Sequence, residues 1–276
     1  MNPLEDYAMT HPIPNVLTIA GSDSGGGAGI QADLKAFSAL GAYGLSVITA
    51  LTAQNTRGVT AVHTPDASFV KAQLDAVFDD IRIDAVKIGM LANANVVRAV
   101  TAALRRYRPV HVVLDTVMIS KSNHALLAPD AVAALRDELL PLATLVTPNL
   151  PEAAALLNVA AAEDEDAMVR QGGALRALGA RAVLMKGGHL SFADSSDWLI
   201  EDSGVLRLGG PRVPLKNTHG TGCTLSSSIA ALLPQRDSLA TATADAKLYL
   251  TGAIERSTRL EVGHRVGPVH HFFRWW

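Results

Sequence analysis

Along nearly the whole chain, short runs of apolar residues alternate with stretches in which apolar residues recur every three or four positions. The short runs predict strands at 16–20, 46–53, 85–90, 110–114, 145–146 and 181–185. The spaced stretches predict helices at 29–40, 66–77, 96–107, 129–140 and 151–157, and two long helices that begin at Thr221 and Ser238. Strands that alternate with helices in this way are typical of a mostly parallel sheet with helices on both faces. The pattern therefore predicts the α/β class.

Two segments depart from this alternation. The stretch from Asp197 to Val213 predicts a pair of short strands around Asp202-Ser203-Gly204, added antiparallel at one edge of the sheet. The acidic run from Glu163 to Asp166 is expected to cap the helix that follows it. Because no linker rich in Gly, Ser or Pro and no internal repeat interrupts the chain, we expect a single domain over residues 1–276, with a flexible N-terminus at 1–15.

Composition narrows the class of protein. Hydrophobic residues make up 49% of the 276 residues and charged residues 18%, which favours a folded core over a disordered chain. A net charge of −2 gives no basic excess for nucleic acid and no polybasic tail for a membrane surface. The N-terminus lacks a signal-peptide pattern and no apolar stretch is long enough to span a bilayer, so we expect a cytoplasmic protein. Cys223 is the one cysteine, which excludes an internal disulfide.

A glycine-rich segment from Ala20 to Gly29 joins the first predicted strand to the first predicted helix. Its last part, from Gly27 to Ala32, fits the loose dinucleotide fingerprint G-x-G-x-x-A. That fingerprint requires an acidic residue about 20 positions later, and residues 35–65 contain none. A turn with only a structural role is a second alternative. We favour a loop that encloses a substrate, with Asp33 and Gln54 nearby to read its polar edges.

A second glycine-rich segment, from Asn217 to Cys223, precedes a long apolar helix. Gly220 and Gly222 leave backbone N–H groups bare at a helix N-terminus, where negative charge is favoured. Such a site suits a phosphoryl group in transfer. Cys223 falls in the first helical turn, which is expected to stabilise its thiolate so that it accepts a proton, although a small buried apolar role is equally compatible. The P-loop motif and the protein-kinase motifs are missing, which excludes those two folds.

Several segments taken together are specific to one family. They lie, in order, at 16–23, 26–35, 49–56, 113–118, 147–152, 185–189, 217–223 and 267–271. From about Val16 to Trp276 the chain resembles the bacterial hydroxymethylpyrimidine/phosphomethylpyrimidine kinases of the ribokinase-like superfamily. The resemblance implies a three-layer α/β/α fold and phosphorylation by ATP and Mg²⁺ of 4-amino-5-hydroxymethyl-2-methylpyrimidine, then of its monophosphate, in thiamine diphosphate biosynthesis. Homodimers are usual in this family.

The resemblance also implies roles for individual residues. Cys223 would be the base, next to an anion hole formed by Gly220, Thr221 and Gly222. Lys186 would reach the ATP phosphates. The pyrimidine would be held by Asp33 and Gln54, with the ring enclosed by Gly21, Ala28, Met90 and Val117. Mg²⁺ would be organised, mostly through water, by Asp115, Asn149 and Glu152. The nucleotide end would be lined by Asp115, Lys186, Thr218 and Lys247.

Three other functions compete with this interpretation. A pyridoxal kinase of the same superfamily would also phosphorylate a hydroxymethyl group on a flat nitrogen ring, but Gln54 in its Thr-Ala-Gln-Asn-Thr context favours the pyrimidine. A non-catalytic regulator that binds the pyrimidine is disfavoured by the intact set of Cys223, Lys186 and Asn149. A dinucleotide-dependent oxidoreductase is disfavoured by the missing acidic residue.

Overall fold

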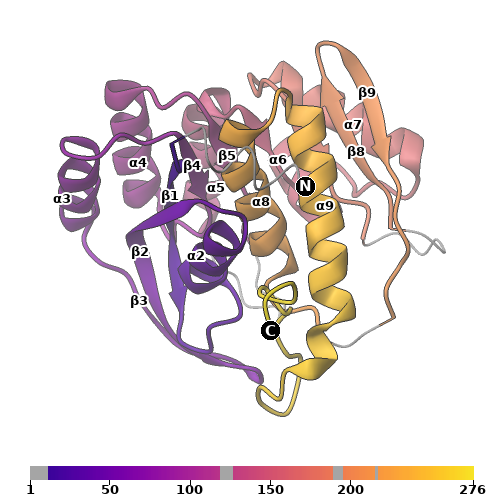
Figure 1. Ribbon diagram of the computed structural model, residues 1–276. Helices are drawn as coiled ribbons and strands as arrows, with labels where there is room; N and C mark the ends of the chain where they lie inside the picture. Colours follow the sequence, from indigo (N-terminus) through magenta and orange to yellow (C-terminus); the bar gives the residue numbers. More distant parts are fainter. Residues whose placement is uncertain (1–11, 119–126, 189–194, 215–216) are drawn as a thin grey trace.

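The computed structural model describes residues 12–118, 127–188, 195–214 and 217–276. Most of the N-terminal segment that was expected to be flexible, 1–15, lies outside the described residues. Within these residues the strands form one sheet of nine, in the order β3-β2-β1-β4-β5-β6-β7-β8-β9. Figure 1 shows the sheet with one layer of helices in front of it and another layer behind it. The predicted three-layer α/β/α arrangement is therefore confirmed.

Six strands run parallel to one another, namely β1, β2, β4, β5, β6 and β7, and each contains buried apolar residues. The strands are β1 (Asn15–Asp23), β2 (Tyr43–Asn55), β3 (Gly58–His63), β4 (Ala85–Ile88), β5 (Val112–Leu114), β6 (Leu145–Val146), β7 (Val183–Met185), β8 (Asp197–Glu201) and β9 (Gly204–Leu208). The hairpin β8–β9 pairs antiparallel with β7, as predicted. The sequence did not predict β3, which pairs antiparallel with β2 at the opposite edge. Its residues are exposed or half-exposed, so no apolar face marks the strand.

The helices divide between the two faces of the sheet. One face carries α2 (Gly29–Ala39), α8 (Thr221–Leu232) and α9 (Leu239–Glu255), which stand in front in Figure 1. The other carries α3 (Ala67–Phe78), α4 (Ala94–Tyr107), α5 (Pro129–Ala134), α6 (Leu150–Leu157) and α7 (Glu165–Ala177). Asp164 caps α7 by accepting from the Ala167 N–H at 2.6 Å, which confirms the predicted role of the acidic run. Three short 3-10 turns, η2 (Leu140–Leu142), η3 (Leu233–Gln235) and η4 (Ser257–Arg259), complete the described helical segments.

The predicted helix at 129–140 is regular only in its first half. After α5 the backbone widens into a π-helical turn, η1 (Leu135–Leu139), and then tightens into η2. Pro141 has no N–H to continue an α-helical ladder and restricts Leu140 before it, which explains the change.

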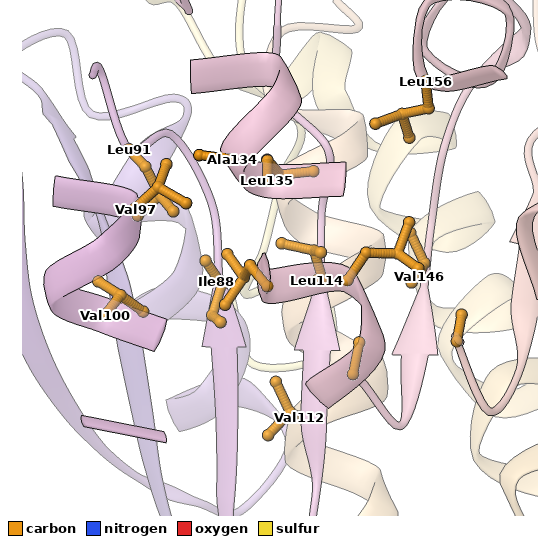
Figure 2. Packing of buried hydrophobic residues seen from close by; sticks show 14 of the residues in the cluster. Ile88, Leu91, Val97, Val100, Val112, Leu114, Ala134, Leu135, Val146 and Leu156 are labelled. Carbon is orange, nitrogen blue, oxygen red and sulfur yellow. The ribbon is translucent and has the colours of Figure 1, made fainter. Parts of the chain in front are cut away.

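The larger core cluster packs the second helical layer against the centre of the sheet. Figure 2 shows Ile88, Leu114 and Val146 on neighbouring strands beneath Val97 and Leu135. Strand order reverses at β1: the chain crosses over α2 to reach β2 and over α3 to reach β4 on the other side. In open α/β sheets such a switch point opens a crevice at the carboxyl ends of the strands, and ligands bind there. The fold thus predicts the place of the site.

Candidate active site

A cavity of about 1590 Å³ lies at the carboxyl ends of the parallel strands, within the part of the chain that the structure describes. It is lined by the ends of β1 and β2, by the turns after β4, β5, β6 and β7, and by the start of α8. The residues expected from the sequence that line it are Gly21, Ala28, Gln54, Met90, Asp115, Val117, Asn149, Glu152, Lys186, Thr218, Gly220, Thr221, Gly222, Cys223 and Lys247. Segments far apart in the sequence therefore meet in one place.

One end of the cavity holds a charged cluster of a lysine and two carboxylates. Lys186 Nζ donates to Asp115 Oδ1 at 3.0 Å and lies 3.8 Å from Glu152 Oε2. Asp115 also accepts from Thr147 at 3.2 Å and from Ser226 at 3.3 Å. Asp115, Thr147 and Lys186 directly follow the adjacent parallel strands β5, β6 and β7, while Glu152 lies on α6 and Ser226 on α8, so the end of the sheet aligns the cluster.

Burial and charge together set the ionisation of this cluster. Burial alone would favour a neutral Asp115, but the ammonium groups of Lys186 and Lys87 hold the pKa of that carboxyl below its ordinary value. Burial raises the pKa of Glu152 in spite of Lys186. Burial opposes the charge on Lys186, yet Asp115 and Glu152 raise its pKa above the ordinary value. Lys186 is therefore a permanent cation at the cavity wall.

Glu152 and Asn149 form a reciprocal cap at the start of α6. The Glu152 N–H donates to Asn149 Oδ1 at 2.9 Å, and the Asn149 N–H donates to Glu152 Oε2 at 2.8 Å. Thr116 holds the same carboxylate oxygen at 3.0 Å. The capping that the sequence predicts here is confirmed. Its second expected role, in metal binding, is compatible with this geometry because each carbonyl or carboxylate oxygen can accept more than one contact.

The donor set at this end fits a Mg²⁺ ion that is held mainly through water and phosphate. Asp115, Glu152 and Asn149 offer the oxygen donors that Mg²⁺ prefers. In the described residues, however, no group of three or more His, Cys, Asp or Glu side chains could hold a metal ion by itself. These three side chains are too few to coordinate a metal ion alone, so they suit an ion that is also coordinated by a substrate phosphate.

The loop before α8 presents its backbone to the charged cluster. Gly220 has a φ of 79°, and a Cβ there would lie 1.8 Å from the carbonyl oxygen of Gly27, so this position requires glycine. A Cβ on Gly222 would lie 3.6 Å from Lys186 Nζ and 3.7 Å from Asp115 Oδ2. The N-terminus of α8 and the Lys186 ammonium therefore face the same small volume, as an anion hole requires.

Cys223 follows this loop and is half-buried at the cavity wall. The sequence predicts a stabilised thiolate, and the structure indicates the opposite. Burial raises the pKa of the thiol to about 11; the ammonium of Lys87 opposes this shift, while the carboxylates of Asp33 and Asp115 act in the same direction as burial. The thiol is therefore protonated at neutral pH, and it can offer or receive a hydrogen bond without carrying charge.

Asp33 is the expected substrate-binding residue that does not line the cavity. Its side chain is fully buried and accepts from Lys87 Nζ at 2.9 Å with both carboxylate oxygens, from Thr18 at 2.6 Å, and from Ser227. Lys87, which the sequence analysis did not single out, lines the cavity in its place. The sequence did carry a sign of this residue, because Lys87 lies within the apolar strand β4 and a lysine buried there needs a buried partner of opposite charge.

The opposite end of the cavity is built from the first glycine-rich loop. A Cβ on Gly21 would lie 3.3 Å from Met90 Sδ, so the two residues pack directly against each other at the cavity wall. Gln54 and two residues that were not assigned a role, Asp23 and His219, line this end as well. Asp23 accepts from three loop amides and contacts His219 at 2.8 Å.

Lys247 on α9 lies where the nucleotide is expected and is itself held in place. Its Nζ donates to Asp197 Oδ2 and to the Ser195 carbonyl, both at 2.6 Å. Asp197 also accepts from the Gly187 N–H at 2.9 Å, next to Lys186. The pair thereby fixes the turn that carries the active-site lysine.

Comparisons with known proteins agree with this geometry. The family model "Phosphomethylpyrimidine kinase" matches residues 23–270. The hydroxymethylpyrimidine/phosphomethylpyrimidine kinase of Escherichia coli is 58% identical over 262 residues, 95% of this chain and 98% of the relative. A crystal structure of phosphomethylpyrimidine kinase from Clostridium difficile aligns with a TM-score of 0.79 and 44% identity, over 87% of this chain and 99% of that one. An ADP complex of Bacillus subtilis pyridoxal kinase aligns with a TM-score of 0.88 and 34% identity, over 96% of this chain and all of that one. The chain therefore belongs to the phosphomethylpyrimidine kinase family and has its ribokinase-like fold.

Proposed function

We propose that the protein transfers the γ-phosphoryl group of ATP to the hydroxymethyl oxygen of 4-amino-5-hydroxymethyl-2-methylpyrimidine, and then phosphorylates the monophosphate product. One observation carries the proposal. The start of α8 lies against the Lys186–Asp115 pair, where a Cβ on Gly222 would be 3.6 Å from Lys186 Nζ, and it lines the same cavity as Gln54, Gly21 and Met90. A cation beside a helix N-terminus, in one cavity with a polar amide and an apolar side chain, fits a phosphoryl transfer to a ring alcohol.

The chain's own residues divide the work. Gln54 reads the ring edge, while Gly21, Ala28, Met90 and Val117 enclose the ring. The backbone N–H groups of residues 220–222 and the Lys186 ammonium stabilise charge on the phosphoryl oxygens in the transition state. Thr218 and Lys247 lie toward the nucleotide. Asp115, Asn149 and Glu152 would hold a Mg²⁺ ion, which when bound neutralises charge on the ATP phosphates.

Cys223 positions the attacking hydroxyl through a hydrogen bond, and the hydroxyl proton passes to an oxygen of the transferred phosphoryl group as the new O–P bond forms and the bond to ADP breaks. A charged base is not required, because transition states of phosphoryl transfer are loose and the attacking oxygen forms little bond to phosphorus. In the second reaction the attacking oxygen belongs to a phosphate that is already ionised. The same thiol should therefore matter less in the second step than in the first.

The test is release of ADP from Mg·ATP with the hydroxymethylpyrimidine as acceptor, with products identified by mass. We expect two successive phosphate additions to the pyrimidine. Pyridoxal is the matched alternative acceptor, because solved pyridoxal kinases at 30–34% identity share the fold with TM-scores of 0.86 to 0.88. Turnover of pyridoxal without turnover of the pyrimidine would contradict the proposed substrate and leave the phosphoryl-transfer site intact.

Two further expectations belong to the proposal, a homodimer and a cytoplasmic location. None of the described helices is long and apolar enough to cross a membrane. Sedimentation of the purified protein at several concentrations would measure the oligomeric state directly, and a monomer at all of them would contradict the dimer.

A further inference from the structure

Asp23 holds three amides of the first glycine-rich loop. Its Oδ1 accepts from the Gly25 N–H at 2.8 Å, and its Oδ2 accepts from the Gly27 and Ala28 N–H groups at 3.1 and 2.9 Å. The side chain is 4% exposed. Burial disfavours the ionised form, but the hydrogen bonds from His219 and the loop amides hold the pKa of Asp23 below its ordinary value. An ionised carboxylate thus orders the loop that encloses the predicted ring site.

The same carboxylate reaches the second glycine-rich loop through His219. His219 Nε2 lies 2.8 Å from Asp23 Oδ2, across 196 residues of sequence. The backbone N–H of His219 donates to the Gly267 carbonyl at 3.1 Å, which holds the backbone of the histidine in place. His219 directly precedes the anion-hole glycines, so its anchorage sets where those amides lie.

The two loops also pack tightly against each other. A Cβ on Gly27 would lie 2.5 Å from Cδ2 of the His219 ring, so only glycine fits beneath that ring. A Cβ on Gly220 would lie 1.8 Å from the carbonyl oxygen of Gly27, so here the two backbones are in contact. Because neither contact leaves free space, a shift of one loop must displace the other.

Gln54 is the third member of this contact. Its Nε2 lies 3.3 Å from His219 Nε2. Because an ionised Asp23 can only accept, His219 Nε2 carries the hydrogen that points at Asp23 and has no lone pair left for the Gln54 amide. The amide hydrogens of Gln54 are therefore left for a ligand in the cavity, such as a ring nitrogen of a pyrimidine.

We propose that His219 is a positioning residue that couples the ring site to the anion hole. Through Asp23 it joins the loop around the ring to the loop that holds the transferring phosphate, so that an aromatic alcohol and a nucleoside triphosphate each favour the ordered form of the other's loop. The coupling rests on the function proposed above. Because binding coupling is reciprocal, each ligand tightens the other by the same factor.

The experiment measures binding without turnover. The affinity of AMP-PCP in the presence of Mg²⁺ is determined by calorimetry, with and without saturating hydroxymethylpyrimidine, for wild type, His219→Leu and His219→Gln. We expect the pyrimidine to tighten AMP-PCP at least fivefold in wild type and less than twofold in His219→Leu. His219→Gln, whose amide can still donate to Asp23, should retain most of the coupling.

The controls separate coupling from damage. His63→Leu makes the same chemical change on exposed β3, outside the cavity, and should couple like wild type. An undiminished coupling in His219→Leu, or no coupling in wild type, would overturn the proposal. If wild type binds AMP-PCP but not the pyrimidine, the proposed substrate fails instead. The same comparison with pyridoxal then decides the role of His219.

Discussion

Two pairs of lysine and aspartate contribute to the same cavity, and they differ in how completely the protein satisfies them. Lys87 and Asp33 are both fully buried, and every carboxylate oxygen is occupied by protein donors. Lys186 keeps 15% of its side chain exposed, with Asp115 on one side and the anion-hole loop on the other. A closed pair of this kind supports the structure, whereas an open pair can exchange a protein partner for a ligand. The two pairs therefore separate the catalytic role proposed for Lys186 from a structural role for Lys87.

The largest effect is expected at the open pair. Lys186→Met should lower kcat by about 10³-fold, because it removes a fixed charge from the transferring phosphoryl group. The free energy of unfolding should fall by less than about 2 kcal/mol, since Glu152 can take up a proton once its cation is gone. Steady-state kinetics and urea unfolding measure the two quantities. Lys71→Met, at an exposed position on α3, is the control, and a loss of kcat below tenfold would contradict the assignment.

The closed pair should respond in the opposite way. Lys87→Met leaves Asp33 buried without its cation and should cost about 3–5 kcal/mol of unfolding free energy. The double variant Lys87→Met/Asp33→Leu should recover at least half of that loss, because no isolated charge remains. Urea unfolding of the two variants checks this. If the single variant lost less than about 1 kcal/mol, the two pairs would not differ as described.

The smallest effect is expected at Cys223, which lies between the two pairs. Cys223→Ala should lower kcat for the hydroxymethylpyrimidine by about tenfold and for its monophosphate by less than threefold, because a hydrogen bond contributes only modestly. With a thiol pKa of about 11, the ionised fraction rises with pH but stays near one in a hundred at pH 9. Profiles of kcat for both substrates should therefore show no thiol ionisation between pH 6 and 9. An inflection in that range that vanishes in Cys223→Ala, or equal losses in both steps, would instead identify a thiolate base.

The sequence predicts those parts of the site best that are formed by residues adjacent to one another in the chain. The Asn149-Leu150-Pro151-Glu152 segment encodes its own cap, and Gly220 encodes the turn that begins α8, so both local features could be predicted before the fold was known. Asp33 shows the limit. On α2 the apolar residues Ile30 and Phe37 are buried, but Asp33 is buried between them while the neighbouring Leu34 is only half-buried.

Contacts between distant segments could not be predicted from such patterns. Asp33 and Lys87 each appear as one polar residue among apolar neighbours, and only the sheet brings them together. The pairing of Asp23 with His219 has the same origin. In each case a polar residue on a buried face indicated that a partner exists, while its identity depended on the tertiary fold.

The meeting of Gly27 with Gly220 and of His219 with Gly267 has a consequence for biosynthesis. The ribosome releases the loop at residues 21–29 early, but the residues that pack against it, 219–267, are made later than all nine described strands, the last of which ends at Leu208. A nascent protein can therefore build the whole described sheet and still lack the contacts between the two loops. Until residue 267 emerges, such a chain should bind the proposed substrates more weakly, so stabilisation by ligand should come late in synthesis.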